Sequence, residues 1–213
     1  MEATPTIDYS TDSFRQWLTD NSLVRGAQEK DIDFARRAFD FLCDKGINRF
    51  IAGQDRTASK ICVNCETDAG GFSFLYCAIL RANGVPARAL VGRMARTGNG
   101  ADNGRLMNQD ETYVKAEFYA AGVGWVPVDI AQSIGYKKAL RIPSFGLDDG
   151  QFLTMEIDPD LVVNTYVFGY QHLSWMQSMA QWIVGSGSAK VSTPSHSWEV
   201  VPASSAASAS NRT

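Results

Sequence analysis

The sequence predicts an α+β fold in which a buried helix packs against an antiparallel sheet. Residues 71–83, GFSFLYCAILRAN, are apolar on nearly all sides, as in a helix that is buried over most of its surface. Residues 85–95 alternate between apolar and other side chains, as a strand does. Residues 111–130 are typical of two strands joined around residues 120–124, which indicates an antiparallel hairpin.

Two amphipathic helices are expected before the buried one. Residues 10–20 form a short pattern with Ser10 or Thr11 as its N-cap. Residues 29–47 form a longer pattern with a wide apolar face, and Gly46 supplies its C-terminal stop. The polar residues that follow, 53–60, are expected to form a loop.

The rest of the chain gives weaker patterns, and residues 1–202 are expected to form one domain. In chain order we predict a mobile loop over 96–110, strands over 151–158 and 161–170, a helix over 172–185, a last strand over 195–202 and a disordered tail over 203–213. Trp175 and Trp182 are expected to belong to the core.

Composition excludes some function classes. The 213 residues carry a net charge of −3, and because no basic run of five or more residues occurs, a nucleic-acid partner is not expected. No apolar run approaches the roughly 20 residues that span a bilayer, so no membrane association is expected. The first residues lack the features of a secretory signal, so the expected location is the cytoplasm.

The cysteines do not predict a cofactor. Cys62 and Cys65 form a single C-x-x-C pair, whereas a zinc site uses about four ligands. His172 and His196, the histidines of the chain, lie far along it. Packing within a loop is the preferred interpretation of the pair, and a disulfide or redox role and a metal role stay open as alternatives. We predict no metal and no cofactor.

Three motifs carry a family resemblance. TDAGG (67–71) leads into the buried helix, LRANGVPAR (80–88) ends it, and VKAEFYAAGVGWVPVD (114–129) forms the hairpin. Together they resemble the transglutaminase-like superfamily, whose members are papain-related cysteine enzymes. The resemblance implies a papain-like fold, a nucleophilic Cys at the start of the helix, a His on a strand and an Asp on the next strand. The helix N-terminus and the imidazolium lower the pKa of such a Cys, and the Asp orients the His.

The resemblance places these three roles on Ala69, Tyr113 and Asp129. Ala69 lies twelve residues before Arg81, where the family has Cys, and Tyr113 lies four before Glu117, where the family has His. The Asp alone is retained. Because no His occurs before residue 172, no shift of register restores a Cys–His pair in these motifs. A tyrosine can give the retained carboxylate a hydrogen-bond partner.

The sequence therefore predicts a domain without the cysteine-hydrolase triad. The main interpretation is a pseudoenzyme or scaffold that holds a peptide or protein in the former active-site cleft. One alternative is a repurposed enzyme that uses Tyr113 and Asp129 as acid and base. Another is an inactivated variant of a cysteine amidase or peptidase. Glu117 is expected in a polar network within the sheet, and the oligomeric state stays open.

Overall fold

The computed structural model describes residues 2–94, 112–136, 140, 144–148, 150–173 and 188. Its helices are α1 (Asp12–Asp20), α2 (Asp31–Lys45), α3 (Ala58–Ile61), α4 (Ala69–Ala82) and α5 (Ile130–Ser133). Its strands are β1 (Ile47–Asn48), β2 (Glu66–Thr67), β3 (Ala87–Met94), β4 (Thr112–Ala120), β5 (Gly124–Val128), β6 (Phe152–Ile157), β7 (Leu161–Asn164) and β8 (Tyr170–Leu173).

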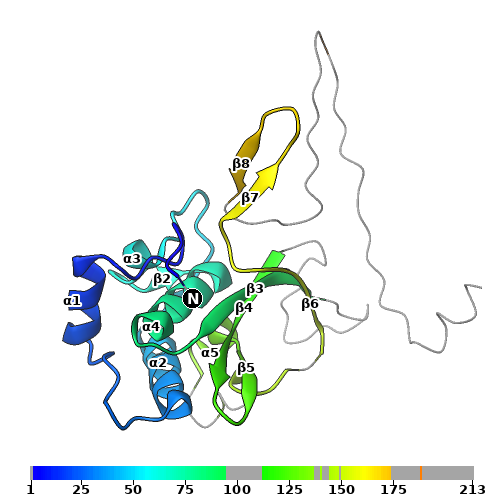
Figure 1. Ribbon diagram of the computed structural model, residues 1–213. Coiled ribbons are helices and arrows are strands. Elements are labelled where there is room, and N and C mark those ends of the chain that lie inside the picture. The colour runs from blue at the N-terminus through cyan, green and yellow to red at the C-terminus, as the bar shows by residue number, and fades with distance from the viewer. Residues whose placement is uncertain are drawn as a thin grey trace, which may run out of the picture.

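The main sheet has the strand order β5-β4-β3-β6, and every neighbouring pair in it is antiparallel. Helix α4 packs against β3 and β4, and α2 contacts α4 (Figure 1). The predicted α+β fold with a helix on an antiparallel sheet is confirmed. The short strands β1 and β2 pair in parallel beside the start of α4. None of the described helices combines the length and the hydropathy that are needed to cross a membrane.

Helix α4 is buried along almost its whole length, from Gly70 to Arg81. Asp68 is its N-cap, and its carboxylate accepts a hydrogen bond from the backbone N–H of Gly71 at 3.2 Å. Asn83 caps the other end, and Gly84 adopts a positive φ of 75°, which glycine tolerates without steric cost. The predicted helix is confirmed, and it begins two residues before the apolar run.

The inward side chains of β3 and β4 form the other half of the core. Ser73 of α4 donates a hydrogen bond to the carbonyl oxygen of Val114 at 3.2 Å, which ties the helix to the middle of the sheet. The strand alternation that the sequence predicts is confirmed. The buried side chains on this face are Ala87, Ala89, Val91, Val114, Ala116 and Phe118.

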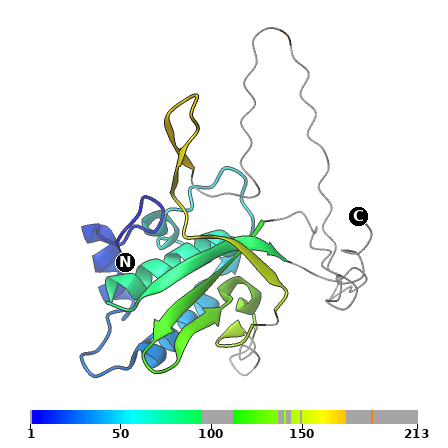
Figure 2. The same ribbon diagram turned by 45° about the vertical axis from the view of Figure 1, so that its right-hand side comes forward.

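Two local predictions are wrong. Residues 58–60, predicted as part of a loop, belong to the single turn of α3, which is too short to show an apolar period. His172, predicted to open a helix, lies in β8, which pairs with β7 in a hairpin that extends away from the main sheet (Figures 1 and 2). The elements predicted over 96–110, 174–185, 195–202 and 203–213 lie outside the described residues, as do Trp175, Trp182 and His196.

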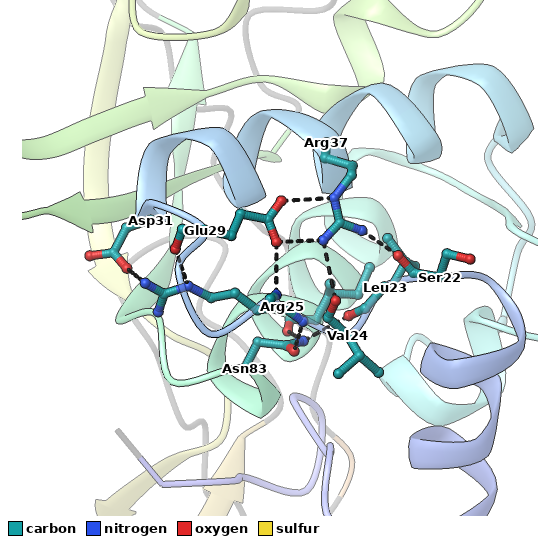
Figure 3. Close-up of polar contacts among 10 residues, drawn as sticks. Ser22, Leu23, Val24, Arg25, Glu29, Asp31, Arg37 and Asn83 are labelled. Atoms are coloured by element: carbon teal, nitrogen blue, oxygen red, sulfur yellow. Dashed lines mark hydrogen bonds and ion pairs between the residues drawn. The ribbon is translucent and has the colours of Figure 1, made fainter.

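A polar network joins the α1–α2 connection to α2 and to the end of α4 (Figure 3). Arg37 donates to both carboxylate oxygens of Glu29, at 2.9 and 2.7 Å, and also to the backbone carbonyl oxygens of Ser22 and Val24. The backbone N–H of Arg25 donates to the side-chain oxygen of Asn83 at 2.8 Å. This network therefore fixes the irregular connection onto two helices.

Replacing Glu29 with glutamine should lower the free energy of unfolding by about 0.5 kcal/mol near pH 7, a small effect because the ion pair is partly exposed. The hydrogen bond from Arg37 holds the pKa of Glu29 below its ordinary value. The stabilisation is therefore present above the unfolded pKa of about 4.3 and is lost as the pH falls. Urea unfolding at about pH 7 and about pH 3 measures it. Glu2→Gln, at an exposed position, is the control, and an equal effect of the two substitutions would contradict the role of the network.

Candidate functional site

Ala69 is the first residue of α4 and is half-buried. Asp68, directly before it, accepts hydrogen bonds from Nε of Arg56 at 2.9 and 3.0 Å, in addition to the one from Gly71. A cation thus lies beside the N-terminus of the helix, next to the position where the family resemblance expects a thiolate. The sequence analysis did not identify Arg56, since nothing in the residues around it marks a buried ion pair.

The loop that carries Arg56 is fixed by hydrogen bonds to β2. The hydroxyl of Thr67 donates to Oε1 of Gln54 at 2.8 Å, and Nε2 of Gln54 donates to the carbonyl oxygen of Glu66 at 2.7 Å. A Cβ on Gly71 would lie 2.1 Å from Oγ1 of Thr67, so only glycine allows β2 to approach the first turn of α4 so closely. The backbone around Ala69 is therefore held on two sides.

Tyr113, near the start of β4, hydrogen-bonds to Asp129. Its hydroxyl lies 2.9 and 3.0 Å from the two carboxylate oxygens. Asp129 follows β5 directly and is the N-cap of α5, where it also accepts from the backbone N–H of Gln132 at 3.0 Å. The residue is only 7% exposed. Its carboxylate thus has polar partners without an imidazole, as burial of a carboxylate requires.

Of the three predicted positions, Tyr113 and Asp129 contact each other directly. Ala69 begins the helix that packs against β4. Its neighbour Gly70 approaches the core face of that strand, since a Cβ on Gly70 would lie 3.6 Å from Cγ2 of Val114, the residue that follows Tyr113. Because side chains alternate along a strand, Tyr113 and Lys115 lie on the opposite face of β4 from Val114.

Lys115 and Phe152 extend the polar site along this opposite face, and the sequence analysis identified neither of them. The rings of Tyr113 and Phe152 meet edge to face with centroids 6.4 Å apart. Nζ of Lys115 lies 5.2 Å from the centroid of Phe152 and 3.5 Å from Oδ2 of Asp148. The residues come from three separate segments, so their proximity depends on tertiary structure.

Glu117 forms an ion pair with Arg88 on the neighbouring strand β3. This agrees with the prediction that Glu117 belongs to a polar network within the sheet. The guanidinium of Arg88 also lies 4.0 Å from the ring centroid of Trp125. This cluster accounts for Arg88 and Glu117 without assigning them a catalytic role.

The cysteines of the chain are free and buried. Burial raises the pKa of Cys62 and of Cys65 to about 11, and it also raises the pKa of Cys77. Such thiols are poor nucleophiles at neutral pH. These observations favour the packing interpretation of the C-x-x-C pair. Within the described part of the chain, no group of three or more His, Cys, Asp or Glu residues could hold a metal ion.

A comparison with models of known protein families agrees with the motifs. The family model of the transglutaminase-like superfamily matches residues 19–130, which is more than half of the chain. A protein from Cytophaga hutchinsonii, described as a candidate cysteine protease, is similar in structure with a TM-score of 0.46 and 12% identity, over 68% of this chain. The match covers 43% of that protein, so the present chain spans less than half of its length.

EGTA-treated LapG from Legionella pneumophila is similar with a TM-score of 0.40 and 18% identity, over 65% of this chain and 73% of LapG. No curated protein sequence matches the chain.

Proposed function

The chain belongs to the transglutaminase-like superfamily, and on that premise we propose that it has lost cysteine-hydrolase chemistry and serves as a peptide- or protein-binding module. The hydrogen bond between Tyr113 and Asp129 is the observation that carries this proposal. The hydroxyl of Tyr113 gives the carboxylate of Asp129 the hydrogen-bond partner that a histidine would otherwise be. Ala69, at the start of α4, has no nucleophilic side chain.

The chemistry of the family explains why both changes matter. The thiolate attacks, and the imidazolium donates a proton to the leaving amine. A methyl group at position 69 cannot attack, and a phenol hydroxyl that donates to Asp129 supplies no cation at neutral pH. Loss of the thiol removes the need for an imidazole, whereas the buried carboxylate still needs a partner. The scaffold is thereby retained while its reaction is lost.

Two features support binding at the start of α4. Phe50 is 72% exposed and lies in the loop that runs beside this helix end, with its ring centroid 5.6 Å from the guanidinium carbon of Arg56. Ala69 is small and half-buried, so it leaves room beside the helix that a larger residue would fill. An exposed aromatic side chain beside such a position is suited to contact a peptide.

The experiment measures binding of an array of short random peptides to the wild-type chain and to Ala69→Trp. The indole should block the site, so affinity for the peptides that bind the wild-type chain should fall by about tenfold or more. Ala121→Trp, an exposed position in the β4–β5 turn, is the matched control and should leave affinity unchanged. Equal binding by the two variants would contradict the proposal.

The same hydrogen bond supports a second candidate, an enzyme that uses Tyr113 and Asp129 as acid and base. Peptide-amide hydrolysis by the wild-type chain that Tyr113→Phe abolishes would favour this candidate over a binding module.

A further inference from the structure

We propose that Lys115, Tyr113 and Phe152 form a binding site for a carboxylate group of a peptide, either an acidic side chain or a C-terminus. This inference rests on the proposed binding function and names the chemistry of its ligand. The site lies on the face of β4 that carries Tyr113, whose hydroxyl contacts Asp129, and the carboxylate of Asp148 in the same chain already contacts Lys115 there.

Lys115 supplies the positive charge of this site. Its side chain is only 9% exposed. Removing an ammonium group from water is costly unless an anion compensates it, so a carboxylate is the group that this position favours. Position 115 lies between Tyr113 and Glu117 on the same strand face, which is the face away from the core.

Asp148 is a loose partner for this lysine. Its carboxylate is 35% exposed, and the closest oxygen lies 3.5 Å from Nζ, beyond the 2.7–2.9 Å of a strong charged hydrogen bond. Its other oxygen already accepts from the backbone N–H of Gly150 at 2.7 Å. The segment before it is anchored more firmly, since the N–H of Gly146 donates to the carbonyl oxygen of Pro127 at 2.8 Å. A carboxylate with better access to Nζ can therefore replace Asp148 while the segment stays in place.

The aromatic ring of Phe152 borders the lysine. Phe152 contacts both Lys115 and the ring of Tyr113. Glycine at position 92 lets the backbone of β6 and the ring of Phe152 approach β3, because a Cβ there would lie 2.0 Å from the carbonyl oxygen of Leu153 and 2.9 Å from Cζ of Phe152. Gly92 is paired with Tyr113 across the sheet, so the missing side chain leaves space for the ring of Phe152 beside Tyr113. A less hydrated site strengthens the attraction between an ammonium group and a carboxylate.

Asp129 and Glu117 are negative groups on this side of the sheet that would oppose an anionic ligand, and Arg88 compensates the charge of Glu117. The hydroxyl of Tyr113 and the N–H of Gln132 both donate to Asp129, which disperses its charge. A cationic ligand would instead meet Lys115 directly. The ligand is therefore expected to be anionic, and a positively charged probe tests the opposite preference.

The experiment is an NMR titration of the ¹⁵N-labelled chain with N-acetylglutamate, N-acetylglutamine and N-acetyllysine amide. N-acetylglutamate should give saturable shifts at the amides of Tyr113, Lys115 and Phe152, and the other two probes should not. In Asp148→Asn the internal competitor is weakened. If Asp148 occupies Lys115 in about nine-tenths of the molecules, its removal tightens N-acetylglutamate binding by about tenfold. Lys115→Met should abolish the saturable shifts, and its spectrum shows whether the variant is folded.

Several outcomes overturn the carboxylate site without affecting the proposed function. These are equal response to the glutamate and glutamine probes, a preference for the lysine probe, weaker or unchanged binding by Asp148→Asn, and saturable binding by folded Lys115→Met. If Lys115→Met is unfolded, Lys115→Gln takes its place, and retained binding by that variant overturns the site equally. Peptide binding that Ala69→Trp blocks would still support the proposed function in each case. Conversely, N-acetylglutamate binding that depends on Lys115 supports the carboxylate site even if Ala69→Trp has no effect on peptide binding.

Discussion

Replacing Arg81 with methionine should lower the free energy of unfolding by about 3 kcal/mol, the low end of what breaking a buried ion pair costs. Its side chain is 2% exposed, and its guanidinium donates to the carbonyl oxygen of Ala87 at 2.8 Å and lies 2.6 Å from Oδ2 of Asp158. Methionine keeps most of the apolar contacts of the side chain but leaves the carboxylate without its cation. Because Asp158 is partly exposed, water compensates some of the loss.

The substitution should also weaken the connection between β3 and β6. The other carboxylate oxygen of Asp158 accepts from the backbone N–H of Ala89 at 2.9 Å, so the arginine and β3 hold the same residue at the end of β6. Urea unfolding gives the change in free energy. Arg88→Met, which removes a more exposed ion pair in the same motif, is the control and should cost about 1 kcal/mol or less. A loss below that of the control would contradict the structural role of Arg81.

Much of the central fold can be predicted from the sequence because its patterns are long and its ends are marked. Asn83-Gly84 follows the apolar run of α4 and the helix ends there as predicted, whereas its first turn begins at Ala69, two residues before the run. The β4–β5 hairpin is marked by alternation on both sides of a glycine-containing turn. Such local signals agree with the tertiary structure here, which is why they suffice.

Other features depend on contacts that no local pattern contains. Gly46 was predicted as a helix stop, but its φ is −72°, so a positive φ is not the reason for glycine there. A Cβ at this position would lie 2.6 Å from the carbonyl oxygen of Leu42 in the same helix, and also 2.8 Å from Cζ of Phe72 and 2.9 Å from Cδ1 of Ile134. The close approach of α4 and of the residue after α5 explains the glycine, and the sequence gives no sign of it.

Some contacts of the candidate site can likewise be predicted from the sequence, and others cannot. The pairing of Tyr113 with Asp129 follows from two motifs with fixed spacing on adjacent strands. The ion pair of Arg56 with Asp68 and the contact of Lys115 with Asp148 join residues 12 and 33 positions apart, and in each pair one partner, Arg56 or Asp148, lies in a loop outside the helices and strands. Charged residues in such loops are common on protein surfaces, so their burial becomes evident only in the folded chain.

The double substitution Ala69→Cys with Tyr113→His should create a reactive thiol at position 69, and either change alone should do much less. A cysteine alone gains from the helix N-terminus but has neither an imidazolium beside it nor a proton donor. A histidine alone has no nucleophile to activate. Because the members of a catalytic triad act as a unit, their effects are far from additive. Asp129 remains in place to orient the new imidazole.

The native cysteines provide a low background for this assay. Because the pKa of Cys62 and of Cys65 is raised to about 11, both thiols stay protonated and react slowly at acidic and neutral pH. Cys77 lies in the buried part of α4, and burial raises its pKa as well. Mass spectrometry of the alkylated peptides then separates an adduct at position 69 from any at these residues. Arg56, close to the same helix end, should help to stabilise the new thiolate in both cysteine variants.

The central claim is that Ala69, Tyr113 and Asp129 occupy the positions of the family's catalytic Cys, His and Asp. The pH profile of iodoacetamide alkylation at position 69 tests this claim most directly. It is measured for the double variant and for both single variants. In the double variant the cysteine should already react at about pH 6, where an ordinary thiol of pKa about 8.5 is almost wholly protonated. Alkylation of the double variant only above about pH 8, with the same profile as Ala69→Cys alone, would show that Tyr113 does not occupy the position of the family's histidine.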